Sequence, residues 1–298
     1  MTKALYVAWQ NPRTRKWFTV GVLRRLGSGT FEFRYTKGAK FAGNEFLPFG
    51  RFRDLGERYL SSALFPLFAN RTLPESKTEH ESFLSWLGLS HSNSADPDPV
   101  EVLSRSGGPR ATDSLEIFPL PEPNENGKAE LEFFVHGVRY VPPELHERLG
   151  RMREGERLFL MFDVQNPVDP KAVAVRSADP PIMLGYCPRY LAHDLRQLLR
   201  RDDDEEVASL SVLRVNRDAP LQYRLLCRLT AIWYPGFRPC SSEEFEPLSR
   251  SDIGEDAVQD EYAYASGNGR VRTTKSQPRK GAPAGRKKSR AQNHSRRR

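Results

Sequence analysis

Two regions of this chain bring together side chains that can bind a charged, flat ligand: residues 136–140 (HGVRY) and residues 162–189 (FDVQNPVDPKAVAVRSADPPIMLGYCPR). The first region ends in an arginine and a tyrosine, and the second contains two polar turns that begin at Asn166 and Asp169. Guanidinium groups donate hydrogen bonds to phosphates, carboxylates accept them from hydroxyl groups, and aromatic rings stack on flat groups. These side chains therefore favour non-covalent recognition.

A strand and a helix are predicted to position these side chains. The small and β-branched residues AVAV indicate a buried strand over residues 171–175. A Gly-Tyr pair and a Pro-Arg pair precede an apparent helix over residues 190–200. Further strands are predicted over residues 131–135, 157–162, 183–186, 207–215 and 222–233. We assign these elements to one domain, residues 130–238.

The order of the motifs GVRY, NPxDPxAVxV and LGYxPR resembles the HIRAN domain, which occurs on helicase-like remodelling enzymes and in small bacterial proteins. In that family the domain is a small β-barrel of the OB type that captures the 3′ end of single-stranded DNA. The resemblance therefore implies a binding site for single-stranded DNA or DNA 3′ ends. Carried over motif by motif, it implies a nucleic-acid site made of Arg139, Tyr140, Asn166, Asp169, Lys171, Tyr186 and Arg189.

The resemblance also implies a role for each kind of side chain. Asn166 and Asp169 would present acceptors from a turn, with Asp169 suited to the sugar hydroxyl. The arginines would bind phosphates and the tyrosines would offer rings for base stacking. The chain departs from the family at Val168, where an aromatic residue often stacks on a base, and at Lys171, where the family has asparagine. Asn-Pro and Asp-Pro are also turn formers in their own right, so a retained scaffold that binds something else is the alternative.

The N-terminal region is predicted to form a second domain, residues 1–120. Strands are predicted over residues 4–9, 17–23 and 30–35, an extended connection over 46–52, and helices over 56–68, 79–87 and 99–103. The stretches VGVLRRLGSGTFEFRY, LFANRTLPES, LGLS and DPDPVEVL resemble the N-terminal subdomain of HipA-type toxin kinases. That resemblance implies a bacterial protein with a surface for a protein partner. The turn-rich residues 104–129 are interpreted as the domain boundary.

Charge is distributed unevenly along the chain. The net charge of +8 is the sum of +8 over residues 1–75, −5 over residues 76–129, −1 over residues 130–235, −6 over residues 236–269 and +12 over residues 270–298. Because nucleic-acid affinity depends on phosphate neutralisation, the two basic ends would have to supply most of it. We interpret residues 239–269 as an acidic linker and residues 270–298 as a disordered basic tail. The tail residues expected to add non-specific affinity are Arg286, Lys287, Lys288, Arg290, Arg296, Arg297 and Arg298.

Several classes of protein are disfavoured. No apolar run approaches the ~20 residues of a membrane span, and the N-terminus has no secretion signal, so a cytoplasmic location is predicted. Three cysteines give neither a disulfide framework nor a zinc motif, and neither a metal nor a cofactor is expected. No kinase, ATPase or nuclease motif is found, so we predict no enzymatic activity.

The sequence thus predicts an α+β protein: a small N-terminal sheet with helices, an OB-like β-barrel with one helix, and a disordered tail. The first functional hypothesis is a non-catalytic nucleic-acid-binding protein. The alternative is a protein–protein adaptor in a toxin–antitoxin-like or defence system, with no nucleotide ligand.

Overall fold

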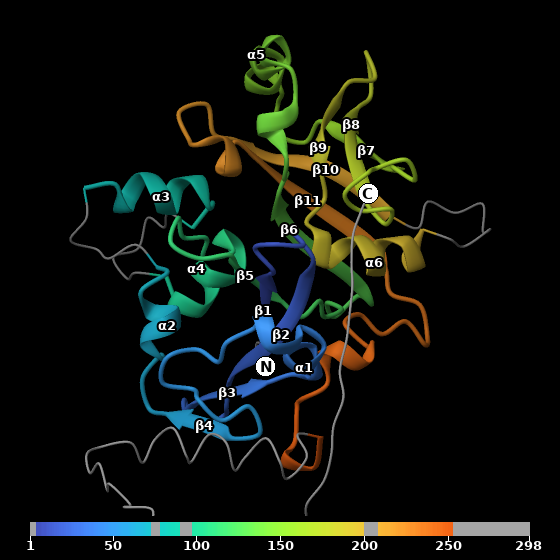
Figure 1. Cartoon of the computed structure of the whole chain (residues 1–298). Helices are drawn as coiled ribbons and strands as arrows, with labels where there is room; N and C mark the ends of the chain where they lie inside the picture. Colours follow the sequence, from blue (N-terminus) through green and yellow to red (C-terminus); the bar gives the residue numbers. More distant parts are fainter. Residues whose placement is uncertain (1–3, 73–77, 90–96, 200–207, 253–298) are drawn as a thin grey trace, which may run out of the picture. The chain divides into compact units, whose positions relative to one another are not determined.

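Two antiparallel sheets and several short helices make up the computed structural model of the chain (Figure 1). It describes residues 4–72, 78–89, 97–199 and 208–252, which belong to one compact unit. This mixed architecture confirms the predicted α+β class. No helix among these residues is long and apolar enough to cross a membrane.

The first sheet has the strand order β4-β3-β2-β1-β5, with every neighbouring pair antiparallel. Its strands are β1 (Ala4–Gln10), β2 (Trp17–Arg25), β3 (Phe31–Tyr35), β4 (Arg58–Ser61) and β5 (Leu115–Pro119). The first three confirm the predicted strands. Aromatic residues dominate the core beside this sheet, and Phe33 lies within 7 Å, ring centre to ring centre, of several other rings, including Phe52 at 4.6 Å.

The helix predicted over residues 56–68 is wrong. Its first part is β4, in which Tyr59 and Leu60 pair with Phe33 and Glu32 of β3, and only Pro66–Ala69 is helical (α2). The apolar spacing that suggested a helix arises by chance, because Leu60 is 53% exposed. A proline at the first position of α2 sets where that helix begins.

The stretch 104–129 contains a strand that the sequence interpretation missed. Strand β5 pairs with β1 and forms the edge of the first sheet, with Ile117 opposite Val7. Because β5 has only five residues between turn-rich segments, its apolar pattern is too short to stand out. The linker between the two sheets therefore begins after Pro119.

Short helices complete the N-terminal half. They are α1 (Lys37–Phe41), η1 (Gly43–Glu45), α2, α3 (His80–Trp86) and α4 (Pro99–Ser106). The last two confirm the predicted helices over 79–87 and 99–103. Helix α4 begins at Asp98, whose carboxylate accepts a hydrogen bond from the Val100 N–H at 2.9 Å, and ends at Gly107 in the left-handed conformation.

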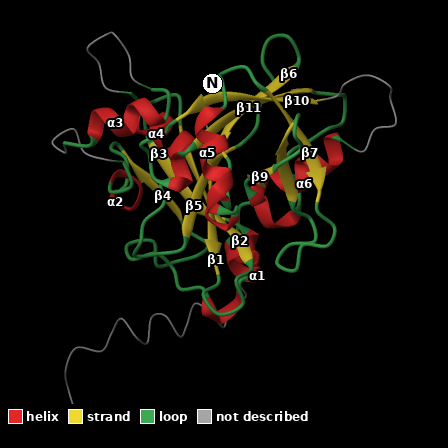
Figure 2. Ribbon diagram, turned by 90° about the horizontal axis from the view of Figure 1, so that it is seen from above, coloured by secondary structure: helices red, strands yellow, loops and turns green. Residues whose placement is uncertain are grey.

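The second sheet is curled and has the order β6-β11-β10-β7-β8-β9. Its strands are β6 (Lys128–Phe134), β7 (Arg157–Phe162), β8 (Val173–Ser177), β9 (Met183–Tyr186), β10 (Ala208–Val215) and β11 (Leu225–Ile232). Helix α6 (Arg189–Leu198) packs Leu191 and Leu195 into the same core, and Figure 2 shows it among the strands of this sheet. All predicted strands and the helix are present, whereas helix α5 (Pro143–Arg151) was not predicted.

Residues 239–252, which we assigned to an acidic linker, pack against the first sheet. Leu248 is buried in the core of that sheet, and Pro247 forms an isolated bridge with Thr36. The Phe245 ring lies 5.1 Å from that of Tyr6. The remaining linker residues, the acidic run 202–206 and the basic tail lie outside the described residues.

Candidate nucleic-acid interface

The two edge strands of the second sheet meet at one point, and this contact places a tyrosine of the predicted site. His136, just after β6, and Tyr186, at the end of β9, exchange two backbone hydrogen bonds of 2.8 and 2.9 Å. Gly185 allows this approach, because a Cβ atom there would lie 2.3 Å from the His136 carbonyl oxygen. The curled sheet is thus a half-barrel whose edges join beside Tyr186.

The short helix η2 (Val138–Tyr140) presents the most exposed aromatic ring of this domain. Tyr140 is 75% exposed, and the Arg139 guanidinium lies over its ring, 4.8 Å from the ring centre. Gly137 precedes η2 in the left-handed conformation and brings the Tyr140 and Tyr186 rings close to the same point. The structure therefore brings Arg139, Tyr140 and Tyr186 together.

The loop between β7 and β8 is held by a network of carboxylate and amide groups. The Tyr186 hydroxyl donates to Asp163 Oδ2 at 2.8 Å, and Asn166 Nδ2 donates to the same oxygen at 3.1 Å. Asn166 Oδ1 accepts from the N–H groups of Val168 and Asp169, both at 3.0 Å. Since these bonds use both lone pairs of the Asn166 amide oxygen, the role of Asn166 is to position the loop.

Asp163 belongs to the site but was missed by sequence reasoning. The hydrogen bond from Tyr186, followed by that from Asn166, lowers the pKa of the Asp163 carboxyl. Burial and the same hydrogen bond raise the pKa of Tyr186, so the hydroxyl stays a donor near neutral pH. The available signal was a carboxylate three residues before Asn166, a spacing typical of polar turns.

Asp169 is paired with a cation of the predicted site. Arg189 Nε lies 2.9 Å from Asp169 Oδ2, while Asp169 Oδ1 accepts from the Lys171 N–H at 2.9 Å. Arg189 is the first residue of α6, so strand–helix packing fixes its position relative to the loop. The predicted phosphate donor and the predicted hydroxyl acceptor therefore form one ion pair.

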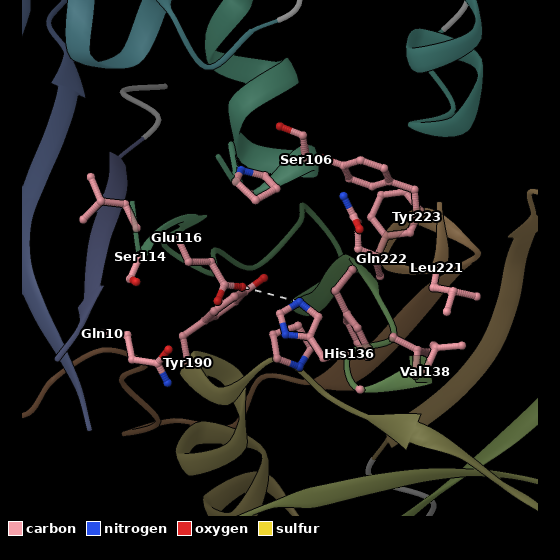
Figure 3. A pocket seen from close by; sticks show the side chains of 18 of the residues that line it. Gln10, Ser106, Ser114, Glu116, His136, Val138, Tyr190, Leu221, Gln222 and Tyr223 are labelled. Carbon is pink, nitrogen blue, oxygen red and sulfur yellow. Dashed lines mark ion pairs between the residues drawn. The ribbon is translucent and has the colours of Figure 1, made fainter. Parts of the chain in front are cut away.

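Five of the seven predicted site residues line two cavities that share a wall, whereas Asn166 and Tyr186 line neither. Arg139 and Tyr140 line one of about 420 Å³, here termed the η2 cavity, and Asp169, Lys171 and Arg189 line one of about 690 Å³, the α6 cavity. The residues common to both are Trp17, Glu116 and Tyr190. In the η2 cavity, His136 Nε2 lies 3.5 Å from Glu116 Oε1, the ion pair drawn in Figure 3. Both cavities thus lie between the half-barrel and strands of the first sheet.

Metal-binding side chains do not gather at this site. Among the residues that the structure describes, no three histidine, cysteine or acidic side chains could hold a metal ion together. The three cysteines, Cys187, Cys227 and Cys240, are buried and free. The side chains around the two cavities provide hydrogen-bonding groups, aromatic rings and charges.

Asp194 of α6 lines the α6 cavity and gives a test of its environment. Burial raises the pKa of this carboxyl from 3.8 to about 6, although the Cys240 N–H donates to it at 3.2 Å. A raised folded-state pKa means that ionisation costs stability as pH rises from about 4 through 6. We expect Asp194→Asn to raise the free energy of unfolding by about 1–3 kcal/mol at pH 8, with the gain shrinking toward zero at pH 4.

Urea denaturation of both proteins at several pH values would measure this gain. Asp179→Asn is the control, because Asp179 is exposed and its substitution should leave the free energy of unfolding unchanged at every pH. A gain at pH 8 that persists undiminished at pH 4 would contradict the assigned ionisation.

A curled antiparallel sheet that presents rings, guanidinium groups and carboxylates defines a small β-barrel binding domain. Residues 128–231 match the family described as the HIRAN domain, so this segment of the chain is a HIRAN domain. The family is known for DNA binding. The predicted HipA-type identity of residues 1–120 stays a prediction, because the match covers only the second sheet.

Two solved structures are similar to the chain. The HIRAN domain of human HLTF shares 19% identity over 36% of this chain and 81% of its own, with a TM-score of 0.26. A protein from Lactobacillus plantarum shares 23% identity over 35% of this chain and 97% of its own, with a TM-score of 0.25. No match was found among curated proteins.

Proposed function

We propose that this chain is a non-catalytic nucleic-acid-binding protein whose HIRAN domain holds the 3′ end of single-stranded DNA. One observation carries the proposal: the exposed Arg139–Tyr140 pair lies beside Tyr186, whose hydroxyl donates to Asp163 in the loop between β7 and β8, here termed the acidic loop. A ring, cations and carboxylates at one edge of the half-barrel match the base, the phosphates and the terminal hydroxyl of a strand end.

The carboxylates give this site its preference for an end. Asp163 and Asp169 both lie on the loop between β7 and β8, and a carboxylate accepts a hydrogen bond from a free hydroxyl but repels a terminal phosphate. Arg139 and Arg189 offer donors for the internal phosphates on either side of this loop. The site would therefore bind a strand with a free 3′-hydroxyl more tightly than one with a 3′-phosphate.

Exposed apolar residues extend the surface next to the acidic loop. Val164 and Val168 are 66% and 70% exposed, so both side chains are accessible to a ligand at this surface. Val168 occupies the position where an aromatic residue often stacks in the family. A smaller side chain there leaves base stacking mainly to Tyr140.

Replacing Tyr140 by alanine tests the proposal. Base stacking contributes roughly 1–3 kcal/mol per base, so affinity for single-stranded DNA should fall by about ten- to a hundredfold. The fold should be unaffected, because Tyr140 is 75% exposed. Fluorescence anisotropy of labelled oligonucleotides measures the affinity, and Tyr234→Ala, outside both cavities, is the control for loss of a tyrosine.

The end preference is measured with matched oligonucleotides that carry a 3′-hydroxyl or a 3′-phosphate. Their difference is insensitive to the basic tail, because the tail meets the same strand in both cases. A clear preference for the hydroxyl that disappears in Asp169→Ala and Asp163→Ala supports end capture. Equal affinities for the two DNAs, unchanged in Tyr140→Ala, would refute the site and favour the adaptor alternative.

A further inference from the structure

Three consecutive residues at the turn between β1 and β2 face the HIRAN site across the two cavities. The turn between β1 and β2 brings Arg15 to the η2 cavity and Lys16 to the α6 cavity, and Trp17 lines both. Arg139 and Tyr140 lie on the HIRAN side of the first cavity, as Lys171 and Arg189 do in the second. Cations and a ring thus lie on both sides of the shared space.

The β1–β2 turn is held in one conformation. The Asn11 side-chain oxygen accepts from the N–H groups of Arg13 and Thr14, both at 2.9 Å, and the Asn11 N–H donates to the Lys16 carbonyl at 2.8 Å. Arg15 adopts a left-handed conformation with φ of 59°, which is unfavourable for an arginine. Gln10 Nε2 donates to the Arg15 carbonyl at 3.0 Å and supports it there. The backbone of the turn therefore needs no rearrangement to present Arg15 and Lys16 to a ligand.

The charges of the turn are not neutralised by the described surroundings. Arg15 and Lys16 are exposed and form no ion pair with another described residue, whereas the neighbouring Arg13 pairs with Glu45. The acidic residues that line the η2 cavity are Asp113, which pairs with Arg71, and Glu116, which lies 3.5 Å from His136 Nε2. In the η2 cavity positive charge is therefore in excess, with four arginines against these two carboxylates. The α6 cavity is more evenly balanced, because its lining includes four carboxylates besides its three cations.

Trp17 and Tyr190 are the aromatic residues of the wall shared by the two cavities, and they differ in how their rings are packed. Tyr190 already stacks on Phe118, with the ring centres 4.2 Å apart, and Tyr223 packs among Phe83, Trp86 and Phe134. Trp17, by contrast, is half-buried, packs in part against the cluster that contains Tyr6 and Phe118, and makes no ring pair with a described residue. An indole beside cations can hold an unstacked base.

We propose that the β1–β2 turn is a second nucleic-acid contact, so that a single strand held by the HIRAN site crosses the cavities onto Arg15, Lys16 and Trp17. This inference rests on the proposed function and adds to it the path of the strand. Trp17 stacks on a base, and Arg15 and Lys16 bind phosphates. The η2 cavity, at about 420 Å³, has the size of a small-ligand site, which spans ~300–1,000 Å³.

The second contact also accounts for the charge distribution along the chain. The HIRAN segment is close to neutral, with −1 over residues 130–235, whereas residues 1–75 carry +8. Phosphate neutralisation supplies most sequence-independent affinity for nucleic acid. Arg15 and Lys16, in the turn between β1 and β2, would supply positive charge for phosphate neutralisation that the near-neutral half-barrel does not carry.

The experiment uses the full chain and a single-stranded oligothymidine, with intrinsic tryptophan fluorescence and anisotropy as readouts. Trp17→Leu should bind about tenfold more weakly and lose the DNA-induced quenching, whereas Trp233→Phe, outside both cavities, should keep it. The double variant Arg15→Gln/Lys16→Gln should reduce the dependence of log K on log salt by about 1.4. Arg51→Gln/Arg53→Gln removes two exposed charges of the same domain away from the cavities and should not change affinity.

Tyr140→Ala separates failure of this inference from failure of the proposed function. If Tyr140→Ala weakens binding while Trp17→Leu and the Arg15/Lys16 variant bind like wild type, the strand does not reach the turn and the inference is wrong. If none of the three alters binding, or wild type does not bind, both are wrong. Because Arg15 and Lys16 are exposed, their variant folds even if Trp17→Leu does not.

Discussion

Gly185→Ala is expected to destabilise the HIRAN domain by roughly 3–5 kcal/mol and to abolish the proposed binding of DNA. The added methyl group would lie 2.3 Å from the His136 carbonyl oxygen and 2.6 Å from a Val135 methyl group. Gly185 also has a φ of 143°, which L-residues rarely adopt. The two hydrogen bonds between His136 and Tyr186 must therefore break, and the edges of the half-barrel must separate.

Loss of that junction would also displace the site. Tyr186 anchors Asp163 through its hydroxyl, and Gly137 brings Tyr140 beside it. Urea denaturation gives the change in the free energy of unfolding, and anisotropy gives the change in affinity. Gly150→Ala is the matched control: Gly150 lies in α5 with nothing within 4 Å of a new Cβ, so alanine there should stabilise slightly, by ~0.5–1 kcal/mol. If the free energy of unfolding of Gly185→Ala equals that of the wild type, the edges of the half-barrel do not meet as described.

Arg71→Ala is expected to cost about 3 kcal/mol of stability, because it breaks a buried ion pair. The Arg71 side chain is 2% exposed, and its two terminal nitrogens donate to the Asp113 carboxylate at 2.6 and 3.2 Å. It also donates to the carbonyl oxygens of Gly108 and Leu67, at 2.8 and 3.1 Å. Alanine would leave these acceptors without their donor and Asp113, 33% exposed, without its cation.

The effect of Arg71→Ala should extend to the η2 cavity. Arg71 ties down the segment between Gly108 and Asp113, and Pro109 and Arg110 of that segment line the cavity. A moderate loss of DNA affinity should therefore accompany the loss of stability. Arg110→Ala is the control, since Arg110 is exposed and should change the free energy of unfolding by less than ~0.5 kcal/mol. Equal stability losses in both variants would contradict the role assigned to the Arg71–Asp113 pair.

Local patterns in the sequence were sufficient to predict an element where that element is long or strongly apolar. Strand β7 was predicted with its exact bounds at residues 157–162, and the AVAV run lies within and just before β8. Strand β5 was missed because five residues are too few to show a hydrophobic period. The segment 56–68 was predicted as a helix because its apolar residues have helical spacing, although Leu60 is exposed in the structure. The HIRAN motifs in residues 128–231 were recognised from their order alone and are confirmed by the family match.

The sequence by itself thus determined the strands of the half-barrel and the residue types available at its edge. The tertiary structure decided which of them meet. The junction of His136 with Tyr186, the pairing of Asp169 with Arg189, and the approach of Trp17 to both cavities join residues far apart in the chain. Turn and strand preferences are set by neighbouring residues, whereas such contacts depend on how the sheets curl and pack, which no local pattern encodes.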